Sequence, residues 1–229
     1  MTEREYFGDW LGLFDVKAFH KTLDIIGSMY DTKSVEPSMS EVFKVFRLCV
    51  PQDCRVVMLG QDPYPQRNIA TGIAFGNRPD TPEDKWSPSL RVLRNSAVDL
   101  EVPHNLITFD PSLESWVTQG VLTLNSSLTV ETGRPGSHTM LWRPFVSNLL
   151  HSLSRYNPDI VFVLLGDVAD TFSPYIDRRC VILRERHPSW YARVGKDMPH
   201  RLFSDIDAVL RFRYGDTIKW YNEESVCQS

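Results

Sequence analysis

A short polar motif, Gly60-Gln61-Asp62-Pro63-Tyr64-Pro65, directly follows the apolar run of residues 55–59. The motif brings an amide, a carboxylate and a phenol together at the end of a β-prone segment. Pro63 and Pro65 fix φ and lack N–H donors, so the turn cannot continue as a helix. The motif is therefore either a stiffened loop that carries chemistry or an ordinary turn in which Asp62 caps the next element.

Three further apolar runs also end close to residues that can form part of a site, two of them with polar side chains. These runs are residues 121–124, which end at Asn125, residues 160–165, which end at Gly166, and residues 181–183, which lead toward His187. A planar amide offers one acceptor and two donors, which suits the carbonyl–NH–carbonyl edge of an imide, and an imidazole can donate to a developing oxyanion. Taken singly, Asn125 can also be a residue that caps a turn. His187 can also be a structural residue whose hydrogen bonds are satisfied within the fold.

Phe75 and three serines lie in stretches rich in glycine or proline. Phe75 has small neighbours in residues 72–76 and can present its ring to a base, although a core phenylalanine is the commoner role. Ser89, Ser137 and Ser189 each follow a proline or glycine in an expected turn, and Pro188 is expected to hold its loop extended. Hydroxyls and backbone N–H groups in such turns suit phosphate contacts, but they are also ordinary turn serines.

The elements that must position these groups alternate along the chain. Helical spacing of apolar residues predicts helices in residues 14–26, 42–46, 89–100, 141–156 and 201–213. Continuous apolar strands alternating with helices indicate a parallel sheet covered on both faces, with ligands bound beyond the carboxyl ends of the strands. We therefore predict an α/β fold, a single domain over residues 1–229 with a central four-stranded parallel twisted sheet flanked by helices. Residues 1–50 form its helical N-terminal part, and residues 51–213, approximately, carry the motifs.

Composition sets limits on the class of protein. The 229 residues carry a net charge of −4, which disfavours non-specific coating of nucleic acid but leaves room for a local basic face. The four cysteines form no CxxC pair, so neither a zinc nor an iron–sulfur site is indicated, and we expect no cofactor. The N-terminus is charged with no apolar stretch behind it, and no run has transmembrane length, so we expect an intracellular protein without membrane contact.

Five segments match, in order, those of the classical uracil-DNA glycosylases of the uracil-N-glycosylase family, and the chain resembles that family over about residues 40–212. They are residues 60–64, 72–75, 88–90, 124–138 and 187–189. The resemblance implies a monofunctional glycosylase that hydrolyses the N-glycosidic bond of deoxyuridine in DNA, releases uracil and initiates base excision repair. It also implies that the target nucleotide is flipped out of the duplex and that no metal is required.

The resemblance also assigns roles to residues around the base. Asp62 would stabilise an oxocarbenium-like transition state and orient or deprotonate water, and a neutral His187 would donate to the uracil oxygen. Phe75 would stack on uracil, and Asn125 would read its imide edge with help from Gln61. The ring of Tyr64 would exclude the methyl group of thymine.

Contacts to DNA are implied for three loops. Ser89 belongs to the segment that resembles a clamping loop for the DNA backbone, Ser137 to the loop after the uracil-recognition strand, and Ser189 to the start of a minor-groove wedge loop. Where the family has Pro-Leu-Ser after His-Pro-Ser, this chain has Trp190-Tyr191-Ala192. Tyr191 therefore takes the position of the intercalating leucine, where an aromatic wedge can fill the gap left by a flipped base.

Two further departures are Pro65, where the family usually has histidine but viral members tolerate proline, and Leu165, where a tryptophan is usual. The alternative function is a catalytically weak, glycosylase-fold DNA-binding subunit of a replication complex. A nucleotide-binding α/β protein is disfavoured because neither GxxxxGK[ST] nor GxGxxG follows a strand.

The partner expected from the resemblance is uracil-containing DNA, single- or double-stranded, bound by a monomer, with a proteinaceous inhibitor or a replication protein as further candidates. The expected location is the cytoplasm of a prokaryotic host, or the nucleus for a eukaryotic or nuclear-virus source. Candidates for a phosphate-facing basic patch are Arg67, Arg134, Arg143, Arg193 and Lys196, although ordinary solvated charges are the commoner interpretation for most of them.

Overall fold

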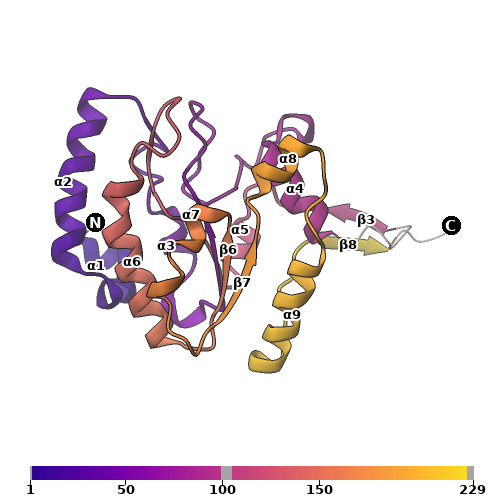
Figure 1. Cartoon of the computed structure of the whole chain (residues 1–229). Helices are drawn as coiled ribbons and strands as arrows, with labels where there is room; N and C mark the ends of the chain where they lie inside the picture. Colours follow the sequence, from indigo (N-terminus) through magenta and orange to yellow (C-terminus); the bar gives the residue numbers. More distant parts are fainter. Residues whose placement is uncertain (1, 99–104, 226–229) are drawn as a thin grey trace.

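A four-stranded parallel sheet lies at the centre of the computed structural model, which describes residues 2–98 and 105–225 (Figure 1). Its strands, in spatial order, are β4 (Val121–Asn125), β2 (Val56–Gly60), β6 (Val161–Leu165) and β7 (Val181–Glu185). All neighbouring pairs are parallel. This confirms the predicted sheet, and each strand lies within two residues of its expected bounds.

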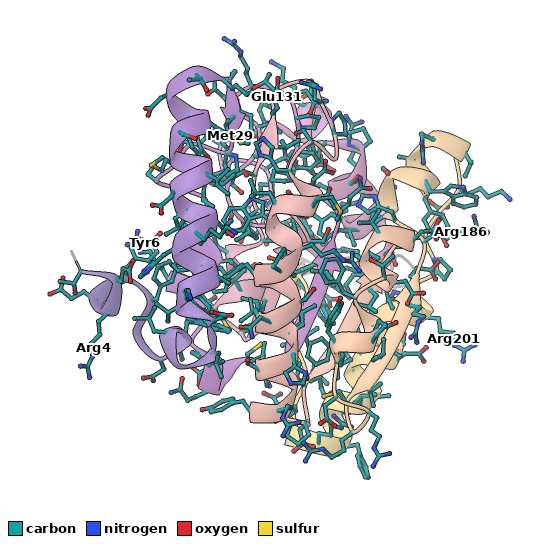
Figure 2. The ribbon with its side chains drawn as sticks, turned by 60° about the vertical axis from the view of Figure 1, so that its left-hand side comes forward. Arg4, Tyr6, Met29, Glu131, Arg186 and Arg201 are labelled. Atoms are coloured by element: carbon teal, nitrogen blue, oxygen red, sulfur yellow. The ribbon has the colours of Figure 1, made fainter. Side chains whose placement is uncertain are left out.

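Helices cover both faces of the sheet. α2 (Val16–Thr32) and α6 (Thr139–Tyr156) pack side by side on one face, and their side chains fill the space between them (Figure 2). α9 (Arg201–Tyr214) packs against β6 and β7 from the other face, beside α4 (Pro88–Ala97) (Figure 1). Because both faces are covered, every residue of β2 and β6 is buried, which explains their continuous apolar sequence.

The helical N-terminal part is held by edge-to-face aromatic packing. α1 (Glu3–Phe7) begins with a capping box formed by Thr2 and Glu5, and Phe7 makes ring contacts to Phe14 and Phe19. Phe19 in turn contacts Phe145 of α6, so the first helices are packed on the layer that covers the sheet. The predicted helix over residues 14–26 starts two residues later, because the Asp15 carboxylate caps it by accepting from the Ala18 N–H at 3.0 Å.

Several short elements complete the fold. The remaining helices are α3 (Lys44–Leu48), α5 (Glu114–Val117), α7 (Asp167–Asp170) and α8 (Pro188–Val194), with 3₁₀ turns at Gly8–Leu13, Pro51–Asp53, Glu83–Lys85 and Ser173–Tyr175. Two antiparallel pairs, β1 (Val35–Glu36) with β5 (Val130–Glu131) and β3 (Asn105–Thr108) with β8 (Asn222–Ser225), lie outside the central sheet. Within the described residues, no helix has the length and apolarity that a membrane span needs.

One local expectation is wrong. Pro188 does not hold an extended loop but occupies the first position of α8, where its missing N–H costs nothing and its fixed φ favours the helix. His187 caps this helix with its side chain, which accepts from the Ser189 N–H. The segment after His187 therefore turns back on itself as a helix.

Replacement of two glycines by alanine should change the free energy of unfolding in opposite directions. Gly120, just before β4, has φ +94°, and an added Cβ would lie 2.2 Å from the Asp53 carbonyl oxygen. Gly120→Ala should lower the free energy of unfolding by about 1–3 kcal/mol from backbone strain alone. Gly27, inside α2, has open space around it, so Gly27→Ala should raise that free energy by about 0.5–1 kcal/mol. Urea unfolding curves of both variants measure the two changes, and equal effects would contradict this account.

Candidate active site

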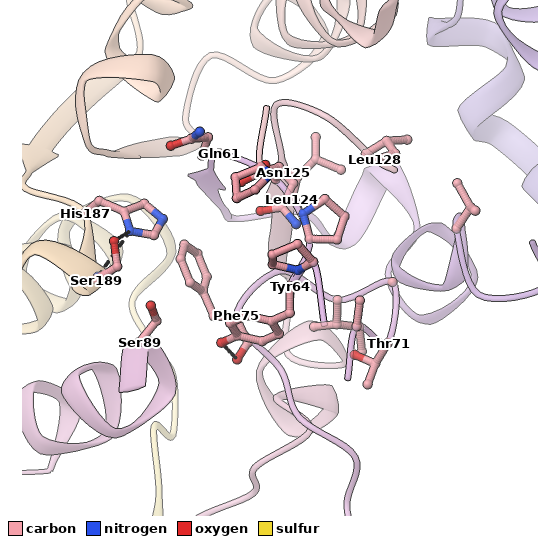
Figure 3. A pocket seen from close by; sticks show the side chains of 18 of the residues that line it. Gln61, Tyr64, Thr71, Phe75, Ser89, Leu124, Asn125, Leu128, His187 and Ser189 are labelled. Carbon is pink, nitrogen blue, oxygen red and sulfur yellow. Dashed lines mark hydrogen bonds between the residues drawn. The ribbon is translucent and has the colours of Figure 1, made fainter. Parts of the chain in front are cut away.

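A pocket of about 370 Å³ lies beyond the carboxyl ends of the strands (Figure 3). Eight of the ten site residues predicted from the sequence line it: Gln61, Asp62, Tyr64, Phe75, Ser89, Asn125, His187 and Ser189. They come from the loop after β2, the end of β4, the segment after β7 and the start of α4. The sheet therefore brings together groups that are up to 128 residues apart in the sequence.

The absence of a side chain at Gly60 allows the two walls of the pocket to meet. Gly60 pairs with Asn125 across β2 and β4, and a Cβ at Gly60 would lie 2.7 Å from both Asn125 Oδ1 and Phe75 Cζ. Phe75 reaches this place with a left-handed backbone, φ 68°, which is costly for an aromatic residue and is typical of functional sites. The Asn125 amide forms no hydrogen bond with any described residue, so its donors and acceptor remain available to a ligand.

Tyr64 is anchored at its hydroxyl. The phenol donates to the Phe75 carbonyl at 2.8 Å and accepts from the Ser87 hydroxyl. Burial raises the pKa of Tyr64, so the phenol stays neutral at ordinary pH. The ring is therefore a rigid wall of the pocket. Ser87 was not among the predicted site residues, and its only signal in the sequence was its place just before Pro88, at the start of α4.

His187 has a defined tautomer. Its Nδ1 accepts from the Ser189 N–H at 3.2 Å and lies 2.8 Å from the Ser189 hydroxyl oxygen. Because a backbone N–H can only donate, Nδ1 carries no proton, and a neutral ring keeps its proton on Nε2. Desolvation by burial, with a smaller contribution from the positive charge of Arg193, lowers the pKa of His187 to about 4. Figure 3 shows the edge of the ring that lies away from Ser189 facing the pocket, where Nε2–H is a neutral donor.

Asp62 is tied to a second loop. Its Oδ2 accepts a hydrogen bond from the Gly136 N–H, and the Pro65 carbonyl accepts from the Gly133 N–H at 2.8 Å. Burial raises the pKa of Asp62, and the hydrogen bond from Gly136 partly offsets this shift. One carboxylate oxygen is thus held by the backbone of the second loop.

Ser137 lies outside the pocket, although its loop takes part. The exposed Ser137 hydroxyl accepts from the Glu131 N–H at 2.8 Å and stabilises the turn itself. The contribution of this loop to the site is the backbone N–H of Gly136, which the sequence analysis did not identify. A glycine with φ +79° at that position was the available signal.

Tyr191, the candidate wedge residue, packs inside the protein. Its side chain is 7% exposed, and its hydroxyl donates to Glu185 Oε1 at 2.6 Å. The physical reason is the helix that begins at Pro188, which places Tyr191 on its inner face, while Trp190 stays half-buried and Arg193 exposed. Although Tyr191 occupies the sequence position expected for an intercalating side chain, it is therefore buried in this structure.

Comparisons with known proteins agree with this architecture. A family model described as the uracil DNA glycosylase superfamily matches residues 46–211. A point variant of mimivirus UNG, crystallised in complex with UGI, has a TM-score of 0.79 at 21% identity over 93% of this chain and 88% of its own.

Two further solved structures are similar. Mimivirus uracil-DNA glycosylase has a TM-score of 0.72 at 21% identity, covering 96% of this chain and 93% of its own. UNG from Nitratifractor salsuginis has a TM-score of 0.62 at 20% identity, covering 89% of each chain. At these identities the structural likeness establishes the fold.

The state of His187 is directly measurable. We expect its imidazole to remain neutral, with the proton on Nε2, until the pH falls to about 4. In the unfolded chain the ring titrates near 6.5, so between about pH 6.5 and 4 the unfolded state binds more protons and stability falls as the pH falls. A nitrogen-15 NMR titration, with His187→Gln to assign the signal, measures both the tautomer and the pKa. Titration near pH 6.5 would contradict the buried neutral ring.

Proposed function

The chain belongs to the uracil DNA glycosylase superfamily, and we propose that it is a uracil-DNA glycosylase that hydrolyses the N-glycosidic bond of deoxyuridine in DNA. One observation carries the proposal: the unpaired Asn125 amide and the Phe75 ring share a pocket with the Asp62 carboxylate and the neutral Nε2–H donor of His187. The amide and the aromatic ring suit recognition of a planar imide. The carboxylate and the Nε2–H donor suit departure of the imide anion.

Recognition of the base follows from the walls of the pocket. The Asn125 amide has the donor and acceptor pattern that matches the O4 and N3–H of uracil. The Phe75 ring offers a face for stacking, and its centroid lies 5.6 Å from that of His187. The anchored Tyr64 ring bars the space that a 5-methyl group would need, which excludes thymine sterically.

Bond breaking needs charge stabilisation on both sides of the scissile bond. As the C1′–N1 bond breaks, its electron pair leaves with uracil, and the Nε2–H of His187 donates to the uracil oxygen where negative charge develops. The Asp62 carboxylate stabilises the oxocarbenium-like sugar and holds the water that adds to C1′. The water proton passes to Asp62 or solvent, and the uracil anion finally takes up a proton, so the reaction consumes one water.

The start of α4 is the proposed contact to the phosphate backbone of DNA. Ser89 is the second residue of α4, a ten-residue helix whose N-terminal N–H groups and dipole favour a phosphate. Ser189 lines the same pocket and fixes the His187 ring, so its hydroxyl orients the donor rather than meeting DNA.

A protein inhibitor is a further proposed partner. The similar variant of mimivirus UNG was crystallised with UGI, and the shared fold supports binding of the same inhibitor to this chain. Initial rates of uracil release with and without added UGI test it.

Replacement of the carboxylate tests the chemical step. Asp62→Asn retains an acceptor for the Gly136 N–H but removes the charge, so uracil release should fall by about 100-fold or more, while binding of uracil-containing DNA changes little. Single-turnover release of uracil from a labelled oligonucleotide, with EDTA present, measures the rate. Asp24→Asn, on the exposed face of α2, is the matched control. An equal loss of binding and turnover would refute the assigned role.

A second prediction concerns specificity. Tyr64→Ala removes the wall of the pocket and should allow release of thymine from ordinary DNA, which the native protein excludes. Tyr64→Phe keeps the ring and loses only the hydroxyl contacts to Phe75 and Ser87, so it should still exclude thymine. Chromatography of the released bases separates the outcomes. If an active Tyr64→Ala variant releases uracil but no thymine, the ring is not the steric barrier.

A further inference from the structure

Residues 61–72, here called the Asp62 loop, run from the end of β2 along the wall of the pocket. Figure 3 shows Gln61, Tyr64 and Thr71 of this loop around the pocket. The loop contains neither helix nor strand, so contacts from other segments must fix its shape. Residues 66–69, in its middle, do not line the pocket, and the loop is held there from behind.

Asn68 is held at both of its backbone polar groups. Its N–H donates to Glu36 Oε2 at 3.2 Å, and its carbonyl accepts from Arg78 Nε at 3.0 Å. The backbone of Asn68 is left-handed, with φ 61°, a conformation that surrounding contacts must stabilise in a residue other than glycine. Two charged side chains therefore fix the turn at residues 67–69.

Glu36 is a buried carboxylate that the proposed reaction does not use. It is 7% exposed, and burying a carboxylate costs free energy unless a hydrogen bond compensates it. The Asn68 N–H supplies such a bond. Burial, and then the negative charges of Glu36 and Glu41, raise the pKa of Tyr30, so both carboxylates act on the same phenol. A carboxylate kept in this place indicates a specific task in holding the loop.

Glu41 supports the same loop at two points. Its carboxylate forms an ion pair with Arg78 at 3.3 Å and so orients the guanidinium that holds Asn68. Its backbone lies against Gly72, at the end of the loop, where an added Cβ would be 1.7 Å from the Glu41 carbonyl oxygen. The loop is therefore seated on the segment that precedes α3.

The strand pair of β1 and β5 joins these contacts to Asp62. Glu36 belongs to β1, which pairs with β5, and β5 leads into the loop that carries Gly136. The Gly136 N–H donates to Asp62, so β5 leads to the support of the carboxylate while β1 supports the middle of the same loop. Because β1 and β5 are hydrogen-bonded to each other, a displacement of Glu36 acts on both supports.

From these contacts we propose that Glu36 and Arg78 are positioning residues for Asp62. They hold Asn68 from behind the pocket, and the β1–β5 pair carries this constraint to the carboxylate. Neither residue lines the pocket, so neither meets the substrate. The inference rests on the proposed function, in which Asp62 must stand at a fixed distance from the sugar, and a misplacement of about 1 Å can cost about 100-fold in rate.

The first test separates the hydrogen bond from the space that the side chain fills. Glu36→Leu removes the acceptor for the Asn68 N–H and should lower kcat for uracil release about tenfold, with KM changed less than about twofold. Glu36→Gln keeps an acceptor oxygen and should restore kcat to within about threefold of the native value. Steady-state release of uracil from a labelled oligonucleotide measures both constants.

A matched control removes a similar contact elsewhere. Asp177 accepts the Arg179 N–H at 3.0 Å before the amino end of β7, so Asp177→Leu should leave kcat unchanged. A native kcat in Glu36→Leu, or a change in KM alone, would overturn the positioning role. A kcat in Glu36→Gln as low as that of Glu36→Leu would overturn the hydrogen bond to Asn68 as its means.

A double-mutant cycle tests the shared anchor. Arg78→Met removes the donor to the Asn68 carbonyl and should also lower kcat about tenfold. Because both side chains act on Asn68, the double variant Glu36→Leu/Arg78→Met should fall little further than the lower single variant. Multiplication of the two losses would show that the residues act independently and would overturn the shared anchor.

Amide hydrogen exchange gives a readout that does not depend on activity. In Glu36→Leu the Gly136 N–H, which donates to Asp62, should exchange about tenfold faster, and Glu36→Gln should restore native exchange. The amides of β6 are the internal reference for global unfolding and should not change. Unchanged exchange at Gly136, or equal acceleration in β6, would reduce Glu36 to a residue that only stabilises the fold.

The two kinds of measurement also separate this inference from the proposed function. If the native protein releases no uracil, the proposed function fails. The exchange of Gly136 then still decides whether Glu36 holds the Asp62 loop: faster exchange in Glu36→Leu that Glu36→Gln reverses supports it, and unchanged exchange rejects it. If the native protein is active but Glu36→Leu keeps its kcat, the positioning role alone fails.

Discussion

The close approach of β2, β4 and the Phe75 segment at Gly60 is the constraint on which the pocket depends. A Cβ at that position would displace the Asn125 amide and the Phe75 ring, which form two walls of the site. The same end of β2 continues into Gln61 and Asp62, so one strand fixes the positions of the amide, the stacking ring and the carboxylate relative to one another. His187 arrives separately, from the edge strand β7, and its position depends on Gly166, where a Cβ would lie 2.8 Å from the His187 Cβ.

Burial shifts the pKa values of the two ionisable groups of the site in opposite directions. It lowers the pKa of His187 and raises that of Asp62, because a poorly hydrated environment disfavours either charge. In the proposed reaction a neutral imidazole serves as a hydrogen-bond donor, whereas the carboxylate must remain ionised to stabilise a cation. The hydrogen bond from the Gly136 N–H lowers the pKa of Asp62 and so opposes the effect of burial on that carboxyl. It does not act on His187. The loop that carries Gly136 therefore allows one dry pocket to hold a neutral donor beside an anion.

The sequence was sufficient where a pattern is repeated along many residues. Four continuous apolar runs specified the parallel sheet, and the polar residues after them converge because parallel strands end at a common edge. The sequence was insufficient where one residue has two roles. Pro188 is compatible with an extended loop and with the first turn of a helix, and the choice of helix is what buries Tyr191. Backbone groups such as the Gly136 N–H, and short strand pairs such as β1 with β5, depend on contacts across the fold and leave almost no local pattern.

The hydrogen bond between Asp62 and Gly136 joins the chemistry of the site to its architecture. The carboxylate that we propose to face the sugar also closes the contact between two loops 74 residues apart in the sequence. A side chain without an acceptor at this position would remove the carboxylate and this contact together, and would leave the hydrogen bond between the Gly133 N–H and the Pro65 carbonyl to hold the two loops. An inert form suited to trapping an intact complex must therefore keep an oxygen at this place, and an amide is the isosteric side chain that supplies one.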